Sequence, residues 1–289
     1  MRDSIKSAVE PGGPFGLDDL PLDPFESLVL VGCHRVLLDA ENPIRLNLFA
    51  AGIREIFTHL LHRLAPDADV IGCAWYVPPP DNKPPTRKQR ARYAMQGGLT
   101  DAFVSRAGVE VETLLKELLD AVDDLSKYTH VRPGSIVSSQ AEIDAFVAGA
   151  TAALRNLFTW IEECRATVAD AVVSTVNQAA LHALVQQTVQ ELDELSSATA
   201  VEDVHVEDLT VVSLTHDAIV FHAAGEVSVE LQWGSPSDFR RGDGATMDAC
   251  FPFRMRLTAR PADVEKLDSF TVADITVENK SWFGVDDEQ

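Results

Sequence analysis

The sequence predicts an α+β protein, in which an N-terminal helical bundle is followed by a small antiparallel β-sheet domain. Apolar residues recur every three or four positions through much of the first 200 residues, which is the period of an amphipathic helix. From Glu207 onward the period changes to two, and runs rich in Val, Ile, Phe and Thr are separated by turn residues. We therefore divide the 289 residues into a partly irregular leader (1–42), a helical domain (43–200) and a β-rich domain (201–289).

The helical domain begins at 43–64, where Pro43 suits a first helical turn and Asn42 a cap. Further helices are predicted at 109–127, at 140–163 and at about 166–195. Gly97 and Gly98 should end the helix that precedes them. In the leader, the run 28–31 fits either a short strand or a helix, because periodicity does not decide so short a segment.

The β-rich domain is predicted to form an antiparallel sheet of about five strands. The apolar runs lie at 209–214, 218–223, 227–231, 251–257 and 270–277, with hairpin-length connections between several of them. The segment 234–244 is polar and rich in glycine, and we expect it to be a loop.

Composition limits the partners of the chain. Its 46% hydrophobic and 24% charged residues are ordinary for a globular protein, and its formal net charge is −21. Nucleic acid would therefore be repelled except at a local basic patch. The four cysteines are far apart and form no CxxC pair, which favours a reducing compartment and predicts no zinc site. The chain shows no signal-peptide pattern and no long uninterrupted apolar run, so we expect a cytoplasmic protein with no membrane contact. We also expect no metal and no cofactor.

The densest group of candidate catalytic residues is the stretch 125–133, which contains Lys127 and His130. Upstream, Arg54 and His59 lie five residues apart on the predicted 43–64 helix. A histidine can act as general acid or base, and arginine or lysine can steady a phosphate, so these four residues form a candidate metal-free nuclease site. The alternative is structural, because His and Lys also stabilise a helix C-terminus. His62 is an alternative partner for His59.

Two further segments are candidate anion sites. The first is a basic run that contains no acidic residue. Its candidate nucleic-acid contacts are Arg87, Lys88, Arg90 and Arg92, and Arg132 further along the chain is a fifth candidate. The alternative is the solvated start of a helix. The second lies in the 234–244 loop, where the candidate ligand or anion contacts are Asp238, Arg240, Arg241 and Asp243. Its alternative is a surface loop with balanced charge.

A third possibility is a metal-dependent nuclease motif of Glu-x-Lys type at Glu278 and Lys280. On a strand these two side chains would share a face, with Asp243, Asp248 or Asp274 as the additional carboxylate. P-loop, GxGxxG, HExxH and GxSxG motifs do not occur, so the usual marks of nucleotide hydrolysis, dinucleotide binding, zinc proteolysis and serine hydrolysis are missing.

Several strings in the chain resemble the predicted pPIWI-associating nucleases of bacteria. They are residues 54–55 with 59–66, 86–90, 96–99, 125–133, and 234–244 followed by 251–253. The helical half is also similar to HEPN domains, whose mark is an arginine followed by a histidine four to six residues later, as at Arg54 and His59. The resemblance implies a nuclease linked to prokaryotic Argonaute-type defence.

Together these observations predict a metal-independent nuclease of a bacterial defence system, acting on RNA. Its expected partners are RNA and an Argonaute-like defence protein, and the helical domain is a candidate homodimer surface. The rival interpretation is a non-catalytic accessory module that binds a protein partner or a ligand, which the strongly negative charge favours.

Overall fold

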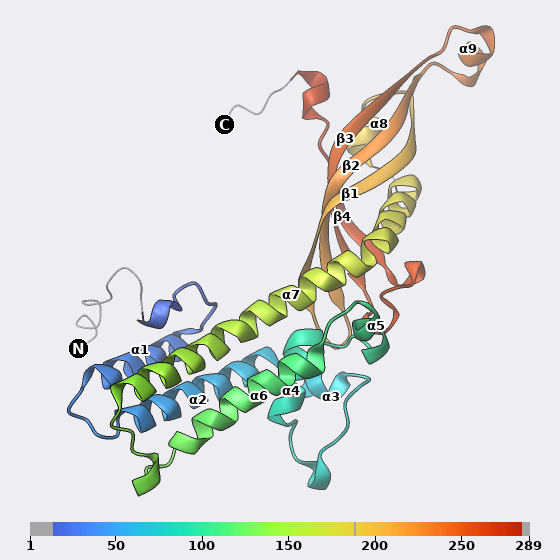
Figure 1. The fold of residues 1–289 in the computed structure, drawn as a ribbon. Coiled ribbons are helices and arrows are strands. Elements are labelled where there is room, and N and C mark those ends of the chain that lie inside the picture. Colours follow the sequence, from blue (N-terminus) through green and yellow to red (C-terminus); the bar gives the residue numbers. More distant parts are fainter. Residues whose placement is uncertain (1–13, 188, 285–289) are drawn as a thin grey trace. The chain divides into compact units, whose positions relative to one another are not determined.

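The computed structural model describes residues 14–187 and 189–284 (Figure 1). Helices dominate the first part of the chain and a four-stranded antiparallel sheet follows, which confirms the α+β prediction. The chain forms two compact units. Within the described residues, the helical unit comprises 14–71, 76–96 and 110–164, and the sheet unit comprises 72–75, 97–109, 165–187 and 189–284.

The helical unit is built around α2 (Arg45–Leu64), as the periodicity of that segment predicts. Phe49, Ile53, Ile56, Phe57 and Leu60 are fully buried along one side of this helix. It packs against α1 (Pro24–Leu38), α4 (Arg87–Gln96) and α6 (Val111–Tyr128). The unit also contains the first part of α7 (Gln140–Gln186), most of α3 (Asp67–Gly72) and 3₁₀ turns at Pro14–Gly16, Pro80–Asn82 and Pro133–Ser135.

The segment left open between strand and helix in the leader is part of helix α1. Asp23 caps this helix, Pro24 occupies its first turn, and Glu26 completes a reciprocal capping box. These polar residues define a helix start that the apolar run alone did not reveal.

Helix α7 corrects the prediction of two helices at 140–163 and 166–195. It is a single helix of 47 residues, followed only by the short α8 (Gln190–Asp193). No glycine or proline interrupts the chain near 164, and buried residues continue at helical spacing through Ile161, Cys164, Val168 and Val172. By length and composition α7 could also cross a membrane, but 44% of its most apolar window is buried inside the fold.

The sheet is a simple meander in the order β1-β2-β3-β4, with four strands where about five were predicted. They are β1 (Ala198–Leu214), β2 (Ile219–Trp233), β3 (Ala245–Ala259) and β4 (Thr271–Val277). The runs predicted at 218–223 and 227–231 are one strand, because Gly225 lies within β2 and pairs with Val206. Strands β1 and β3 also begin earlier than predicted, in sequences with few large apolar residues.

One face of the sheet forms the core of its unit. The odd-numbered residues of β2 and β3 from Ile219 to Leu231 and from Phe251 to Ala259 are buried, and the even-numbered ones alternate with them on the other face. Figure 1 shows the later part of α7 alongside the sheet, where the Asn177 side chain accepts a hydrogen bond from the Val206 amide at 2.8 Å. The unit also contains α5 (Asp101–Arg106) and 3₁₀ turns at Pro261–Asp263, Leu267–Ser269 and Lys280–Phe283.

The tip of the β1–β2 hairpin packs directly against Gly97 and Gly98. The Gly98 amide donates to the Thr215 carbonyl at 2.9 Å, and a Cβ added to Gly98 would lie 2.2 Å from the His216 carbonyl oxygen. Gly97 has a left-handed φ of +52°, which ends α4 as the sequence predicted. This contact explains why Gly97 and Gly98 are both glycine.

The predicted loop at 234–244 contains a short helix, α9 (Pro236–Arg241). Ser235 caps it with a reciprocal bond to Asp238, Pro236 occupies the first turn, and Gly242 ends it in a left-handed conformation. Ser235, Pro236 and Gly242 suggested a loop, but they start and end a short helix only six residues long.

Candidate functional site

The N-terminus of α1 holds two carboxylates in fixed positions. The Asp23 Oδ1 atom accepts from the Glu26 amide at 2.8 Å, and the Asp23 amide donates to Glu26 Oε2 at 2.8 Å. This reciprocal arrangement satisfies two amides at the helix start, and it leaves Asp23 Oδ2 facing away from the backbone it caps.

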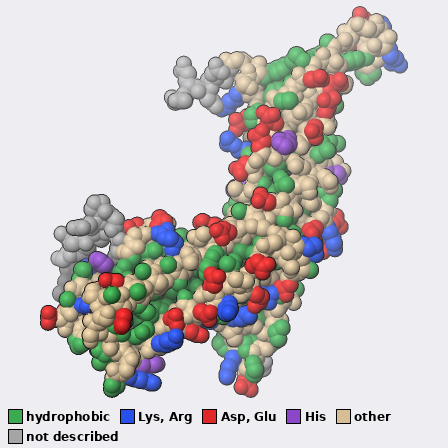
Figure 2. Space-filling model, viewed as in Figure 1, with side chains coloured by type: hydrophobic (Ala, Val, Ile, Leu, Met, Phe, Trp, Pro, Cys, Tyr) green, Lys and Arg blue, Asp and Glu red, His purple; other side chains and the backbone are tan. Residues whose placement is uncertain are grey.

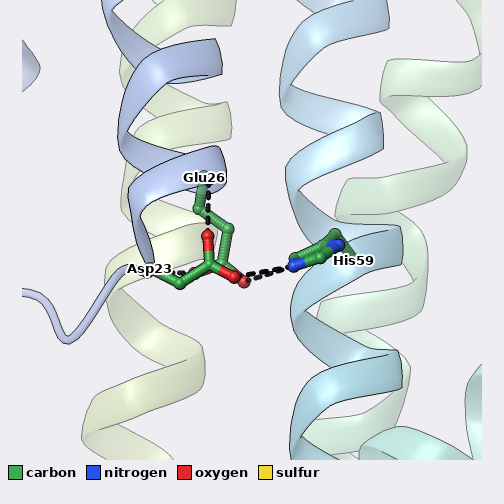
Figure 3. A group of neighbouring side chains, drawn as sticks. All are labelled: Asp23, Glu26 and His59. Atoms are coloured by element: carbon green, nitrogen blue, oxygen red, sulfur yellow. Dashed lines mark hydrogen bonds and ion pairs between the residues drawn. The ribbon is translucent and has the colours of Figure 1, made fainter.

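Helix α2 brings His59 to these carboxylates (Figure 3), and Arg63 on the same helix also reaches them. His59 Nε2 lies 2.7 Å from Asp23 Oδ2 and 4.0 Å from Glu26 Oε1. One turn further along α2, Arg63 donates to both Glu26 oxygens at 3.1 and 2.9 Å and to the Pro21 carbonyl at 3.0 Å. We call Asp23, Glu26, His59 and Arg63 the α1–α2 cluster.

Burial divides the α1–α2 cluster into an inner ion pair and an outer dyad. The Glu26 side chain is completely buried, so its charge depends on the bidentate guanidinium of Arg63. Asp23 and His59 are more accessible, with 25% and 41% of their side chains exposed. The hydrogen bond from the Glu26 amide, assisted by the one to His59, lowers the pKa of Asp23 below its ordinary value. Asp23 is therefore ionised at neutral pH and holds the imidazole by a charge-assisted bond.

This geometry gives His59 the chemistry of a general base. If Nε2–H donates to Asp23, Nδ1 is left as the proton acceptor. The exposed ring of Phe25 lies beside the imidazole, with ring centroids 4.8 Å apart. An exposed aromatic ring next to a histidine–aspartate dyad offers a stacking surface for a nucleobase.

The same group has the composition of a metal site, since one ligand atom each from Asp23, Glu26 and His59 lies within 4.8 Å of the others. The donor set is, however, already engaged. Both oxygens of Glu26 accept hydrogen bonds from Arg63, and one accepts from the Asp23 amide as well. A divalent ion would have to displace a guanidinium from a buried carboxylate, which argues against a resident metal here.

Arg54 belongs to a different neighbourhood. Its Nη1 atom donates to Thr129 Oγ1 at 3.2 Å, at the end of α6, and its buried Nε atom has no acceptor among the described residues. The stretch 125–133 therefore meets Arg54, as proposed from the sequence, whereas the bonds of His59 go to α1. Five residues along a helix turn side chains about 140° apart, which explains the separation.

The other two members of the predicted catalytic set show features of a helix end. Lys127 pairs with Asp124 at 2.5 Å on the exposed side of α6. This bond raises the pKa of Lys127 above its ordinary value. The His130 carbonyl accepts from Ser135 Oγ at 2.8 Å, while its exposed ring forms no hydrogen bond within residues 14–187 and 189–284.

The basic run is largely paired within the helical unit. Arg90 was a predicted nucleic-acid contact. It is only 3% exposed and bonds to the Ala65 carbonyl and to Asp67, so its guanidinium is not available to nucleic acid. Lys88 pairs with Glu112 at 2.8 Å. Arg92 donates to Gln96 at 3.1 Å. Arg87 forms the longest of these ion pairs, with Asp123 at 4.0 Å. Arg132 lies exposed just before a 3₁₀ turn.

Arg87 lines a small cavity of about 210 Å³ between α2 and α4. The cavity also contains Thr58 and His62 on α2. Arg87 of the basic run thus lies near the second histidine of α2. Arg87 places a positive charge there in a chain of net charge −21, and the face seen in Figure 2 carries acidic side chains scattered among basic, apolar and other ones.

The candidates in the sheet unit are either neutralised or differently placed. Arg241 bonds to Asp238 and lies 3.5 Å from Asp243, and Arg240 donates to the Pro236 carbonyl at 3.2 Å, so the charges of this segment balance within α9. The hydrogen bonds from Ser235 lower the pKa of Asp238, and Arg241 adds to the effect.

Glu278 and Lys280 lack the strand geometry that the Glu-x-Lys motif requires. Strand β4 ends at Val277, and Lys280 begins a 3₁₀ turn. Glu278 instead approaches Arg254 at 3.4 Å. The metal-nuclease interpretation through these two residues therefore loses its structural basis.

Sequence reasoning found His59 but missed its three partners. A signal was present, because Asp23-Pro24-Phe25-Glu26 is a capping-box pattern with proline in the first turn, and Arg63 follows His59 by one helical turn. The contacts between α1 and α2 join residues that are far apart in the sequence, and no local sequence pattern predicts them.

Two family models match the chain, at residues 17–154 and 161–283, and both are described as "Predicted pPIWI-associating nuclease". The chain belongs to this family. The two matched regions meet within α7, close to the point where the compact units divide. The α1–α2 cluster lies in the first matched region and the whole sheet in the second. No curated protein and no solved structure matches the chain.

Proposed function

We propose that this predicted nuclease cleaves RNA without a metal ion, with His59 as general base and Asp23 as its positioning residue. The observation that carries the proposal is the 2.7 Å contact between His59 Nε2 and Asp23 Oδ2 on a partly exposed imidazole. The family description supports the broader assignment as a nuclease.

The reaction requires only a base and stabilisation of a pentacovalent phosphorus. His59 Nδ1 takes the proton of a ribose 2′-hydroxyl, and the 2′-oxygen attacks the adjacent phosphorus. The P–O5′ bond breaks, the leaving 5′-oxygen takes a proton from water, and the products are a 2′,3′-cyclic phosphate and a 5′-hydroxyl. The protonated imidazole then returns its proton to solvent.

Neighbouring groups account for substrate binding. A nucleobase stacks on Phe25, which is 48% exposed. The Nη1 atom of Arg63 is not used in the bonds that hold Glu26, so it serves as a positioned cation for the phosphate. Arg87 extends the contact along the strand.

The family description also names an association with pPIWI proteins. We therefore propose an Argonaute-like protein as the partner, within a cytoplasmic bacterial defence system. In the rival proposal the chain is a non-catalytic module for such a partner, which the internal pairing of most candidate cations favours. A purified chain that binds the partner but leaves RNA intact would support the rival.

The test measures cleavage of a fluorescent single-stranded RNA in the presence of EDTA. The wild-type chain should cleave it, and His59→Ala should lower the rate at least about 100-fold, the usual contribution of a general base. His62→Ala is the matched control, because it removes an exposed histidine three residues away and should keep most of the activity. A His59→Ala rate equal to wild type would refute the assignment, and a DNA substrate of the same sequence should resist because it lacks the 2′-hydroxyl.

A further inference from the structure

The open face of the sheet carries a row of polar residues brought together by strand register. His222 on β2 pairs with Thr210 on β1 and with Arg256 on β3. In the next row of the same face, Ala224 lies between Asp208 and Arg254. Directly opposed residues in adjacent strands have Cβ atoms about 5 Å apart, so these side chains are neighbours although they span almost 50 positions of sequence.

These residues line a depression of about 590 Å³, which we call the sheet-face pocket. Its polar and small side chains come from all four strands and are Asp208, Thr210, His222, Ala224, Arg254, Arg256 and Asp274. The hollow has a physical cause, because Ala224 is short and β-bulges interrupt the pairing on both sides, between Val206 and Asp208 and between Arg254 and Arg256.

The basic side chains of the sheet-face pocket are not fully paired with other residues of the pocket. The Arg256 guanidinium and the His222 ring have no hydrogen bond or ion pair with any residue that the structure describes. Arg254 has only an exposed contact with Glu278 at 3.4 Å, which contributes little. In a chain of net charge −21, an arginine and a histidine without acidic partners in a concavity are available to an external anion.

Backbone strain coincides with this location. Asp274 has φ of +52°, in the left-handed region, and sits at the bulge of β4 that faces Arg254 and Arg256. A non-glycine residue in this region is unusual, and such residues cluster at ligand sites. At this bend Asp274 leaves the regular strand pairing and lines the pocket.

We propose that the sheet-face pocket binds a nucleotide phosphate. Arg254, Arg256 and His222 supply donors for the phosphate oxygens, and guanidinium groups bind phosphate bidentately. Asp208, Thr210 and Asp274 supply acceptors for the ribose hydroxyls. The source of the phosphate is either a free mononucleotide or the end of an RNA strand. The site is independent of the α1–α2 cluster, which lies in the helical unit.

The test uses the full chain with His59→Ala, so that cleavage does not consume the ligand. Calorimetry in EDTA measures binding of 5′-AMP, of a short 5′-phosphorylated RNA and of the same RNA with a 5′-hydroxyl. Arg256→Gln and His222→Gln should each weaken binding of the phosphorylated ligand about 10-fold or more, as expected for a lost charged hydrogen bond. Arg260→Gln is the matched control, because Arg260 directly follows β3 but pairs with Asp263 at 3.0 Å.

The ligands distinguish the source of the phosphate. Weakened binding of both 5′-AMP and the phosphorylated RNA assigns the pocket to a free nucleotide, whereas an effect on the RNA alone assigns it to a strand end. Equal binding of the phosphorylated and unphosphorylated RNA, or unchanged affinity in Arg256→Gln and His222→Gln, would overturn the proposal. Binding of 5′-AMP involves no cleavage and is measured in the His59→Ala background throughout, so its result does not depend on the role of His59.

Discussion

The helical unit and the open face of the sheet differ in how their basic side chains are paired. In the helical unit most candidate cations already have partners, such as Arg63 with Glu26, Arg90 with Asp67 and Lys127 with Asp124. On the open face of the sheet, Arg256 and His222 have none among the described residues. Pairing holds helices together, whereas an unpaired arginine in a hollow is available for a ligand.

This difference shows why local motifs mislead. The arginine–histidine spacing on α2 and the basic run on α4 look functional in sequence, but most of their members are used to attach one helix to another. In the helical unit the exception is the accessible His59, which Asp23 holds without burying it. In the sheet unit the functional candidates are distributed over all four strands of the sheet and form no local sequence motif.

The largest effect on stability should come from breaking the inner ion pair of the α1–α2 cluster. Arg63→Ala leaves the buried Glu26 carboxylate without its cation and should lower the free energy of unfolding by about 3 kcal/mol. Lys127→Ala removes an ion pair whose side chains are 70% and 60% exposed and should cost less than about 0.5 kcal/mol. Urea denaturation compares the two, and equal losses would show that the Glu26 pair is not a structural anchor.

A comparable effect is expected at the centre of the sheet. A Cβ added to Gly225 would lie 2.0 Å from the His205 carbonyl oxygen, so Gly225→Ala should cost about 2–3 kcal/mol through displacement of β1. Gly149→Ala is the control in α7, where an added Cβ meets open space, and it should stabilise the chain by about 1 kcal/mol. Thermal unfolding of both variants checks the opposite signs. A stable Gly225→Ala variant would contradict the close approach of β1 and β2.

A smaller, pH-dependent effect should distinguish the charge of Asp23 from its role as a helix cap. Its pKa is lowered in the folded protein, so ionisation stabilises the fold above the ordinary value of 3.8, and this contribution is lost as the pH falls through the lowered pKa. Asn caps helices as well as Asp but carries no charge. Asp23→Asn should therefore have a lower Tm than wild type at pH 7, and the difference should shrink below pH 3.8. A difference that does not change with pH would assign the effect to capping alone.

The smallest perturbation is a thiol-labelling experiment that compares the interior of the helical unit with the sheet face. Burial raises the pKa of Cys33 and of Cys164 to about 11, whereas Cys250 is exposed. At pH 8 a disulfide reagent should label Cys250 rapidly and the buried Cys33, Cys73 and Cys164 only after unfolding. Cys250→Ser should remove the rapid phase. Rapid labelling that persists in this variant would show that at least one buried cysteine is accessible in the folded protein.

Much of the fold was predictable, because amphipathic periods are local. The period of α2 and α6, the glycine stop after α4 and the alternation within β2 all gave the correct element type. Strand number and the continuity of α7 were not predictable, because a glycine inside a strand resembles a turn and a helix without breakers resembles two adjacent helices. The candidate sites depend on distant residues, as Asp23 and His59 or His222 and Arg256 show, and no local pattern records such contacts.

RNA cleavage in EDTA, compared among wild type, His59→Ala and His62→Ala, decides most clearly whether His59 is the general base. We expect products that end in 2′,3′-cyclic phosphate for wild type and His62→Ala, with a rate at least about 100-fold lower for His59→Ala. Cleavage that requires a divalent metal, or that proceeds equally fast in His59→Ala, would contradict this assignment.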